Sequence, residues 1–462
     1  MEQSIIFDLD LIKRYDKSGP RYTSYPTAVQ FHEGFAEENY RAVAQATNNE
    51  QPLRPLSMYF HIPFCDTVCF YCGCNKIATK NRDKAQPYLD RVYRELEMQS
   101  ALFDENRIVD QLHWGGGTPT FISHAQMREL MAKTRQTFKL HDDDRGEYSI
   151  EIDPREVKND TIKLLRELGF NRMSLGAQDF EPAVQKAVNR IQSEQQTFEV
   201  MAQAREVGFK SVSVDLIYGL PLQTVESFAR TLDKVIEASP DRLSVFNYAH
   251  LPEMFKPQRR INEDDLPAPA VKLGILQMSI EKLANAGYVY IGMDHFARPD
   301  DELAIAQREG SLYRNFQGYS THAECDLLGI GVSSIGMVGH SYSQNVKGLD
   351  DYYRIIDSGY LPLFRGVELN DDDLLRRAVI TQLICNFELN IKSIEQQYGL
   401  RFDDYFATEV EVLKTMQQDG LLEMDAISIR VQAQGRLLIR NICMVFDRYM
   451  REPSMQRYSK VI

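Results

Sequence analysis

The middle of the chain repeats one pattern of polar and apolar positions. Residues 166–170 read Arg-Glu-Leu-Gly-Phe and lead into the apolar run 173–176, and residues 205–209 read Arg-Glu-Val-Gly-Phe and lead into 212–215. A looser copy occupies 284–291. Each glycine suits the position after a helix C-terminus, because the backbone there often has a positive φ, which favours a residue without Cβ. Helices that alternate with strands in this way predict a parallel sheet with right-handed crossovers.

Six short apolar runs in the central region predict strands, and amphipathic segments between them predict helices. The strands are expected at 56–61, 109–114, 148–152, 172–176, 211–217 and 243–247. Six strand–helix units favour an α/β fold with an open, partial (β/α)6 barrel over a closed eightfold barrel.

The C-terminal part has a different pattern. Helices are expected at 371–384, at 403–418 and from about Gly435, with two short strands at 421–423 and 427–431. Helices with a small hairpin predict a mostly helical, winged-helix-like domain. We therefore expect an N-terminal extension over the barrel mouth at 1–50, the barrel at 51–300, a connecting segment that packs on the barrel at 301–370, and a C-terminal helical domain at 371–462.

Composition and charge restrict the class of function. Of 462 residues, 43% are hydrophobic and 26% charged, which is typical of a globular protein. The net charge of −13 argues against a nucleic-acid partner, because phosphate neutralisation needs a basic surface. The N-terminus lacks the basic start and apolar run of a signal peptide, and no run approaches the ~20 apolar residues of a membrane span. We expect a cytoplasmic protein with no membrane contact, and a monomer.

A cluster of cysteines is the strongest chemical signal. Four of the seven cysteines lie between positions 65 and 74, and three of them form the pattern Cys65-x3-Cys69-x2-Cys72. Three thiolates on a loop can hold three irons of a [4Fe–4S] cluster and leave the fourth iron open. A structural zinc site is the alternative, but it usually needs four ligands, and no second cysteine pair is present. Cys74 could be a fourth ligand, although its closeness to Cys72 would strain the loop.

Two further features follow predicted strands. A glycine-rich loop, Gly-Gly-Gly-Thr-Pro at 115–119, exposes backbone N–H groups that can bind a carboxylate. Glu151 ends the third strand and Asp215 the fifth, where ligands bind in folds of this kind. Either carboxylate can bind ribose hydroxyls or an amine, or can simply be solvated.

The chain resembles the radical S-adenosylmethionine (SAM) superfamily through its three-cysteine loop, Tyr71 and the glycine-rich loop. Within it, the chain resembles the HemN family of oxygen-independent coproporphyrinogen III oxidases (dehydrogenases). This likeness rests on Gly-Pro-Arg-Tyr-Thr-Ser-Tyr-Pro-Thr-Ala at 19–28, His-Ile-Pro-Phe-Cys at 61–65, His-Trp-Gly-Gly-Gly-Thr-Pro-Thr at 113–120 and Glu-Ile-Asp-Pro-Arg at 151–155. It continues through Asp-Leu-Ile-Tyr-Gly-Leu-Pro at 215–221 and Phe-Asn-Tyr-Ala-His at 246–250.

The resemblance implies a site and two kinds of cofactor. Cys65, Cys69 and Cys72 are expected to bind a [4Fe–4S] cluster. The residues expected to contact the cluster-bound SAM are Tyr59, Gly116, Glu151 and Ile335. Those expected to contact a second SAM molecule are Tyr71, Gly117, Thr118, Gln178, Arg190, Asp215 and Ala249.

The resemblance also implies a reaction in porphyrin and haem biosynthesis. Reductive cleavage of SAM would give a 5′-deoxyadenosyl radical, which takes a hydrogen atom from a propionate of coproporphyrinogen III. Two propionates lose carbon dioxide and become the vinyl groups of protoporphyrinogen IX. The implied partners are a cytosolic electron donor such as flavodoxin and an unidentified electron acceptor. Because the substrate is anionic, Arg21 and Tyr22 are candidates for contacting it at the barrel mouth, although Arg21 could be an ordinary surface residue.

Two other functions stay open at this point. A haem-binding chaperone of the same superfamily would share the cysteine loop, but it lacks the Arg-Tyr-Thr-Ser-Tyr segment at 21–25 and a cysteine like Cys74. A radical methylase would need an added methyl-carrying cysteine or cofactor domain, and the surroundings of Cys325 do not indicate that role.

Overall fold

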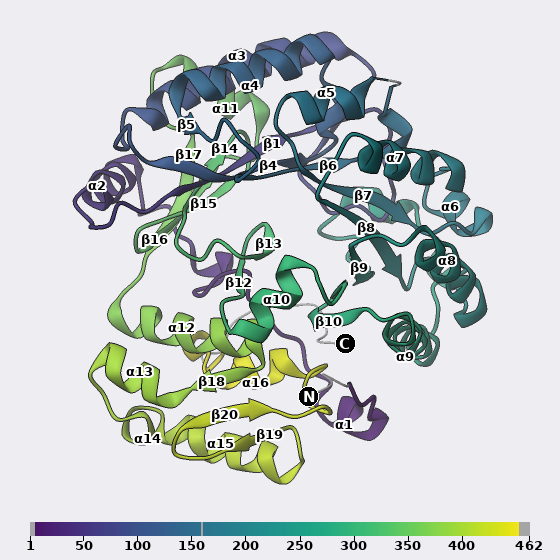
Figure 1. Cartoon of the computed structure of the whole chain (residues 1–462), viewed down its shortest axis with the longest axis vertical. Helices are drawn as coiled ribbons and strands as arrows, with labels where there is room; N and C mark the ends of the chain where they lie inside the picture. The colour runs from purple at the N-terminus through teal and green to yellow at the C-terminus, as the bar shows by residue number, and fades with distance from the viewer. Residues whose placement is uncertain (1–4, 159, 452–462) are drawn as a thin grey trace. The chain divides into compact units, whose positions relative to one another are not determined.

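The computed structural model describes residues 5–158 and 160–451 (Figure 1). Residues 1–4 of the predicted N-terminal extension and 452–462 of the predicted C-terminal domain lie outside the described residues. The chain forms two compact units. The barrel unit comprises Phe31–Lys272 and Glu324–Glu368, and the helical unit comprises Met1–Gln30, Leu273–Ala323 and Leu369–Ile462.

Six parallel strands form the centre of the barrel unit, and each corresponds to a predicted strand. In sheet order they are β9 (Arg242–Asn247), β8 (Ser211–Tyr218), β7 (Arg172–Gln178), β6 (Glu147–Ile152), β4 (Ile108–Gly116) and β1 (Leu56–Ile62). Each neighbouring pair is parallel. The short β5 (Lys139–Leu140) pairs with β4. The predicted partial (β/α)6 barrel is therefore confirmed.

Helices cover the outer face of these strands, as Figure 1 shows. They are α3 (Ala85–Ser100), α4 (His124–Thr137), α5 (Thr161–Glu167), α6 (Pro182–Ala187), α7 (Glu194–Glu206) and α8 (Val225–Ala238). Local sequence sets their ends: Ser123 and Gln126 cap α4 reciprocally, at 2.9 and 3.3 Å. Gly169 and Gly208 have φ of +103° and +83°, as the repeated pattern predicts.

The sheet extends beyond β1 through a segment that returns from far along the chain. Strand β14 (Asp326–Ile330) pairs with β1 in parallel, and β15 (Ile335–Val338), β16 (Ser341–Asn345) and β17 (Leu363–Glu368) follow antiparallel. The unit also contains α2 (Glu37–Thr47), α11 (Leu349–Asp357) and the short parallel pair β2 (Phe64–Cys65) and β3 (Ile77–Ala78). Buried Glu95 of α3 stabilises the extension, since it accepts hydrogen bonds from the Gly331 N–H, Asn345 and Tyr352.

The helical unit is assembled from three stretches of chain. Its helices are α1 (Leu9–Arg14), most of α9 (Pro269–Asn285), α10 (Glu302–Glu309), α12 (Asp371–Asn386), α13 (Ile391–Tyr398), α14 (Phe402–Tyr405), α15 (Ala407–Gln418) and α16 (Ile439–Val445). Its strands form two hairpins, β10 (Val289–Gly292) with β11 (His295–Ala297) and β12 (Tyr313–Asn315) with β13 (Gly318–Ser320), and a small sheet of β18 (Glu388–Asn390), β20 (Ser428–Val431) and β19 (Leu422–Met424).

Three details of the C-terminal prediction are wrong. The helix expected at 403–418 is divided at Phe406, whose ring is fully buried against Phe402 and Phe446. The last helix begins at Ile439 and not near Gly435, because a turn precedes it. A third strand, β18, joins the predicted hairpin.

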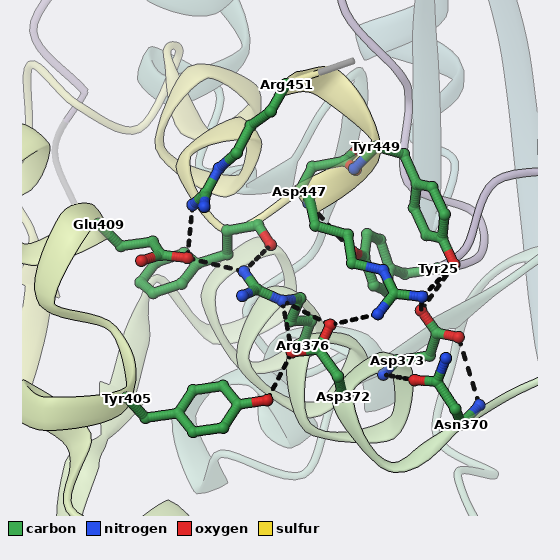
Figure 2. A network of polar contacts seen from close by, with 12 residues as sticks. Tyr25, Asn370, Asp372, Asp373, Arg376, Tyr405, Glu409, Asp447, Tyr449 and Arg451 are labelled. Atoms are coloured by element: carbon green, nitrogen blue, oxygen red, sulfur yellow. Dashed lines mark hydrogen bonds and ion pairs between the residues drawn. The ribbon is translucent and has the colours of Figure 1, made fainter.

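Figure 2 shows a network of charged side chains that stabilises the helical unit. Arg376 of α12 donates to Glu409 of α15 at 2.8 Å, and both side chains are buried. Arg376 also donates to the Phe446 carbonyl oxygen, and Arg448 pairs with Asp372 at 2.7 Å. These contacts join α12, α15 and the segment after α16.

No helix among the described residues is both long enough and apolar enough to span a bilayer.

Candidate active site

The predicted functional residues of the barrel unit gather where the parallel strands end. A cavity of about 340 Å³ lies there, lined by residues in the C-terminal halves of β4, β6, β7, β8 and β9 and in the loops that follow β1, β4, β6 and β7. Its lining contains eleven of the predicted residues, namely Cys65, Cys69, Tyr71, Cys72, Gly116, Gly117, Thr118, Glu151, Gln178, Arg190 and Asp215. We call it the cofactor cavity.

The cysteine loop is fixed at both ends and in the middle. The Ile77 N–H donates to the Pro63 carbonyl at 2.7 Å, and the Thr79 N–H donates to the Cys65 carbonyl at 2.8 Å. Near its centre, the Phe70 N–H donates to the Val188 carbonyl at 2.9 Å. Three thiols are thus held on one short loop whose backbone is hydrogen-bonded to the barrel.

The glycine-rich loop lies directly against the cysteine loop. The Gly117 N–H donates to the Ile62 carbonyl and the Thr118 N–H to the Phe64 carbonyl, both at 2.8 Å. The Thr118 hydroxyl lies 3.5 Å from the Cys65 Sγ. A Cβ on Gly117 would lie 2.7 Å from the Pro63 carbonyl carbon, so only glycine permits this approach.

Two arginines flank the Cys69 thiol. Arg155 Nη2 and Arg190 Nη1 each lie 3.6 Å from its Sγ, and Asp153 pairs with both arginines at 2.7 and 3.1 Å. Burial raises the pKa of Asp153, but Arg190 and Arg155 more than offset this, so its pKa is lowered and the carboxylate is ionised. The sequence analysis gave no role to Asp153 or Arg155. The signal was present, because both directly follow the third strand.

Glu151 is also ionised, but His113 and a backbone N–H lower its pKa in place of arginines. It accepts from the Gly116 N–H at 3.1 Å and lies 3.3 Å from His113 Nε2. Burial raises its pKa, but the hydrogen bond and charge of His113 and the Gly116 N–H lower it further. The Glu151 side chain is 46% exposed, and a carboxylate at the glycine-rich loop in a cavity that the cysteines also line can bind an amino group.

Asp215 differs from Glu151, because burial raises its pKa to about 6. Its carboxylate accepts from the Ser174 hydroxyl at 2.5 Å. Gln178 lies at the end of the neighbouring strand with a φ of +65°. Together these residues present acceptors and amide groups suited to ribose hydroxyls.

Tyr59, Ala249 and Ile335 do not line the cofactor cavity. Tyr59 stacks on His113 with ring centroids 5.8 Å apart, and its hydroxyl donates to His61 Nδ1 at 3.1 Å. The carbonyl of Ala249 accepts from Gln258, which also donates to the Tyr71 carbonyl. Ile335 begins β15.

Arg21 belongs to the helical unit, where it pairs with Asp294. Tyr22 of the same unit is buried, and its hydroxyl donates to Asp447 at 2.9 Å. Their role at the barrel mouth therefore stays a prediction.

The residues of the cavity fit the two expected cofactors. Cys65, Cys69 and Cys72 together are the donor set of a cluster with an open iron. Cys74 is a fourth thiol that also lines the cavity, and its predicted non-ligating role stays a prediction. Cys325, Cys385 and Cys443 are buried elsewhere in the chain. Arg190 Nε is buried and has no hydrogen-bond partner among the described residues, so the cavity contains a donor that a bound anion or hydroxyl can satisfy.

The fold and this loop define a radical SAM protein. Residues 59–235 match the family model of the Radical SAM superfamily, and residues 369–438 match that of the HemN C-terminal domain. Membership of this superfamily implies a [4Fe–4S] cluster and SAM.

Similarity to individual proteins extends over the whole chain. It is 55% identical to the oxygen-independent coproporphyrinogen III oxidase of Pseudomonas aeruginosa, and the match covers 100% of both chains. It is 54% identical to the oxidase of the same name from Escherichia coli, and that match covers 100% of this chain and 99% of the relative. The solved structure of Escherichia coli coproporphyrinogen III oxidase (HemN), described as a radical SAM enzyme, superposes with a TM-score of 0.92 at 53% identity, covering 96% of this chain and 100% of the other. The chain belongs to the family of oxygen-independent coproporphyrinogen III oxidases.

Proposed function

We propose that this protein oxidises coproporphyrinogen III to protoporphyrinogen IX without oxygen, by removing two propionate carboxyl groups as carbon dioxide. The observation that carries the proposal is the match at 53–55% identity over essentially the full chain to oxidases of this name. The grouping of three loop thiols, a glycine-rich loop and carboxylates in one cavity supports it. A haem-binding chaperone role is not favoured, because the full-length relatives carry the oxidase name.

The chain's own residues bind and orient the cofactors. The three loop cysteines would hold the cluster, and Glu151 with the Gly116 N–H would bind the amino acid end of SAM. When bound, the cluster and SAM supply the reductive bond cleavage that starts the reaction. Arg155 and Arg190 each place a guanidinium group 3.6 Å from the Cys69 sulfur, where it can donate a hydrogen bond to this ligand.

The finer assignment of contacts remains part of the proposal. Cluster-bound SAM would contact Tyr59, Gly116, Glu151 and Ile335. A second SAM would contact Tyr71, Gly117, Thr118, Gln178, Arg190, Asp215 and Ala249. All of these residues except Tyr59, Ala249 and Ile335 line one cavity with the cysteines. Tyr59 is linked to the segment after the cysteines by His61, which accepts from the Tyr59 hydroxyl and donates to the Asn75 carbonyl at 2.9 Å. The Tyr71 carbonyl accepts a hydrogen bond from Gln258, which fixes the backbone of this residue. Tyr71 also lines the cavity, where its ring can stack on an adenine.

Partners and location complete the proposal. We infer a cytoplasmic monomer that receives electrons from a donor such as flavodoxin and passes electrons to a separate acceptor. The fourfold division at 1–50, 51–300, 301–370 and 371–462 also stays a proposal.

An anaerobic assay tests the function. The reconstituted protein would be mixed with coproporphyrinogen III, SAM and dithionite, and the porphyrin product read by mass after oxidation. The proposal requires loss of two carboxyl groups and formation of two vinyl groups. Tight haem binding together with unchanged coproporphyrinogen III would instead support the chaperone function.

A further inference from the structure

A second cavity adjoins the cofactor cavity in the barrel unit. Its volume is about 550 Å³, within the range of small-molecule sites. Cys72, Cys74 and Lys76 line both cavities, so they form the wall between them. We call this second cavity the side chamber. A molecule in the side chamber would lie next to Cys72, one of the expected cluster ligands.

The lining of the side chamber is cationic and apolar. Lys76, Lys256 and Lys347 are among the lining residues, and none of the described residues that line the chamber is acidic. This is a local exception in a chain with a net charge of −13. Such a lining suits an anion, because a compact ammonium group binds carboxylates strongly.

Among the described residues, two of these lysines have no anionic partner. Lys76 donates to the Cys72 carbonyl at 3.0 Å. By contrast, Lys256 and Lys347 are exposed, and no carboxylate within residues 5–158 or 160–451 pairs with either. Their ammonium groups are therefore available to a ligand.

Apolar side chains lie beside these cations. Met254 is 64% exposed in the chamber wall, and Phe255 packs so closely on the cysteine loop that a Cβ on Gly73 would lie 3.1 Å from its ring. Exposed apolar surface next to these cations fits a ligand with an apolar body and anionic arms.

Hydrogen bonds fix the chamber relative to the cysteine loop. The Asn75 side chain donates to the Lys347 carbonyl at 3.2 Å, and the Asn75 carbonyl accepts from His61 at 2.9 Å. These bonds hold the backbone of Lys347 beside the cysteine loop, so its side chain starts from a fixed point near Cys72. Positioning of this kind is what a reaction at one atom of a large substrate requires.

We propose that the side chamber binds one propionate-bearing edge of the porphyrinogen substrate, with Lys256 and Lys347 on its carboxylates and Met254 and Phe255 against its pyrrole carbons. The inference rests on the proposed function and assigns its substrate-positioning residues. A flat protein surface would be expected for a docking electron carrier, whereas this site is a concave cavity of small-molecule size.

The test uses the reconstituted holoenzyme and two pairs of substitutions. Lys256→Gln with Lys347→Gln removes the two chamber cations. Lys163→Gln with Lys186→Gln removes two exposed lysines from the outer helices α5 and α6 and is the matched control for charge. Met254→Glu places a negative charge in the chamber at an exposed position and is not expected to affect folding.

Two readouts separate binding from electron delivery. The first is binding of coproporphyrin III, the aromatic form of the substrate, measured by its fluorescence. The second is the KM for coproporphyrinogen III with dithionite as reductant, so that no protein carrier takes part. We expect the Lys256→Gln, Lys347→Gln pair to weaken binding about 25-fold, which is about fivefold for each partly solvated ion pair, and Met254→Glu to weaken binding as well. KM should rise more than kcat falls, while the control pair behaves as wild type.

The outcomes distinguish failure of the substrate-binding role of the side chamber from failure of the proposed oxidase function. If the wild type converts the substrate but the chamber variants bind coproporphyrin III as tightly as the control pair, the chamber assignment is wrong and the function stands. If those variants are slow only with a flavodoxin donor, the chamber serves electron transfer and the assignment is again wrong. If the wild type neither binds nor converts the substrate, the proposed function itself fails.

Discussion

Replacing Gly117 by alanine tests the contact between the glycine-rich loop and the cysteine loop. The added Cβ would lie 2.7 Å from the Pro63 carbonyl carbon and 2.8 Å from the Phe64 carbonyl oxygen. Since non-bonded carbons prefer about 3.5–4.0 Å, one loop must move by roughly 0.8 Å. The atoms in the way are backbone, so no side chain can rotate aside.

The structure sets the magnitude of this perturbation. A shift of this size lengthens the 2.8 Å hydrogen bonds that the Gly117 and Thr118 N–H groups donate, to beyond the normal range. Overpacking costs about 1–3 kcal/mol and each weakened hydrogen bond about 1 kcal/mol. We therefore expect a local cost of about 3–5 kcal/mol, which would weaken SAM binding roughly a hundredfold or more.

The assay compares Gly117→Ala with Gly208→Ala. Gly208 has a φ of +83°, but no atom lies within 4 Å of the position that a Cβ would take, so its substitution should cost only about 1 kcal/mol of folding free energy. Iron content and SAM affinity by calorimetry should fall in the first variant alone. Wild-type SAM affinity and full iron content in Gly117→Ala would refute the reasoning.

Three more predictions follow from the site and the helical unit. Replacing Cys65, Cys69 or Cys72 by serine should abolish the brown chromophore and SAM cleavage, whereas Cys74→Ala should still assemble a cluster. Iron loss in Cys74→Ala as complete as in these serine variants would show that Cys74 is a ligand. Because burial raises the pKa of Asp215 to about 6, its ionised form destabilises the fold. The unfolding free energy of the wild type relative to Asp215→Asn should therefore fall as pH rises from about 4 to about 6. SAM affinity should rise over the same interval only in the wild type, and identical pH profiles in calorimetry would contradict this. Glu409→Ala leaves buried Arg376 without its carboxylate on α15 and should cost about 3–5 kcal/mol in denaturant unfolding. Glu411→Ala, on the same helix but 70% exposed, should cost less than about 1 kcal/mol, and equal costs would refute the role of the network in Figure 2.

The parallel sheet was predictable because one face of its strands is apolar and buried, so that in β6, β7 and β8 buried positions alternate with half-buried ones. Alternating apolar positions mark a strand locally, and all six strands were located within two residues at each end. The return of β14 to pair with β1 was not predictable, since the pairing joins residues far apart in the chain and no local pattern marks it. The buried Glu95 that secures this extension likewise resembles a surface helix residue in the sequence.

The candidate site was predictable to the extent that it lies in local motifs. The cysteine spacing, the glycine-rich loop and the strand-end carboxylates each occupy a short stretch of sequence. The two arginines at Cys69 come from separate segments, because Arg155 follows β6 and Arg190 follows α6, and only the tertiary fold brings them together. The side chamber escaped prediction for the same reason, because its lysines are ordinary surface residues in the sequence and become a site only beside Cys72.

Transfer of a labelled hydrogen tests the central claim most directly. Coproporphyrinogen III carrying deuterium at the β-carbons of its propionates would be incubated anaerobically with the reconstituted protein, SAM and dithionite. The account predicts 5′-deoxyadenosine that contains deuterium, formed together with a porphyrin product bearing vinyl groups. Vinyl product accompanied by unlabelled 5′-deoxyadenosine, or labelled substrate recovered unchanged while SAM is cleaved, would contradict it.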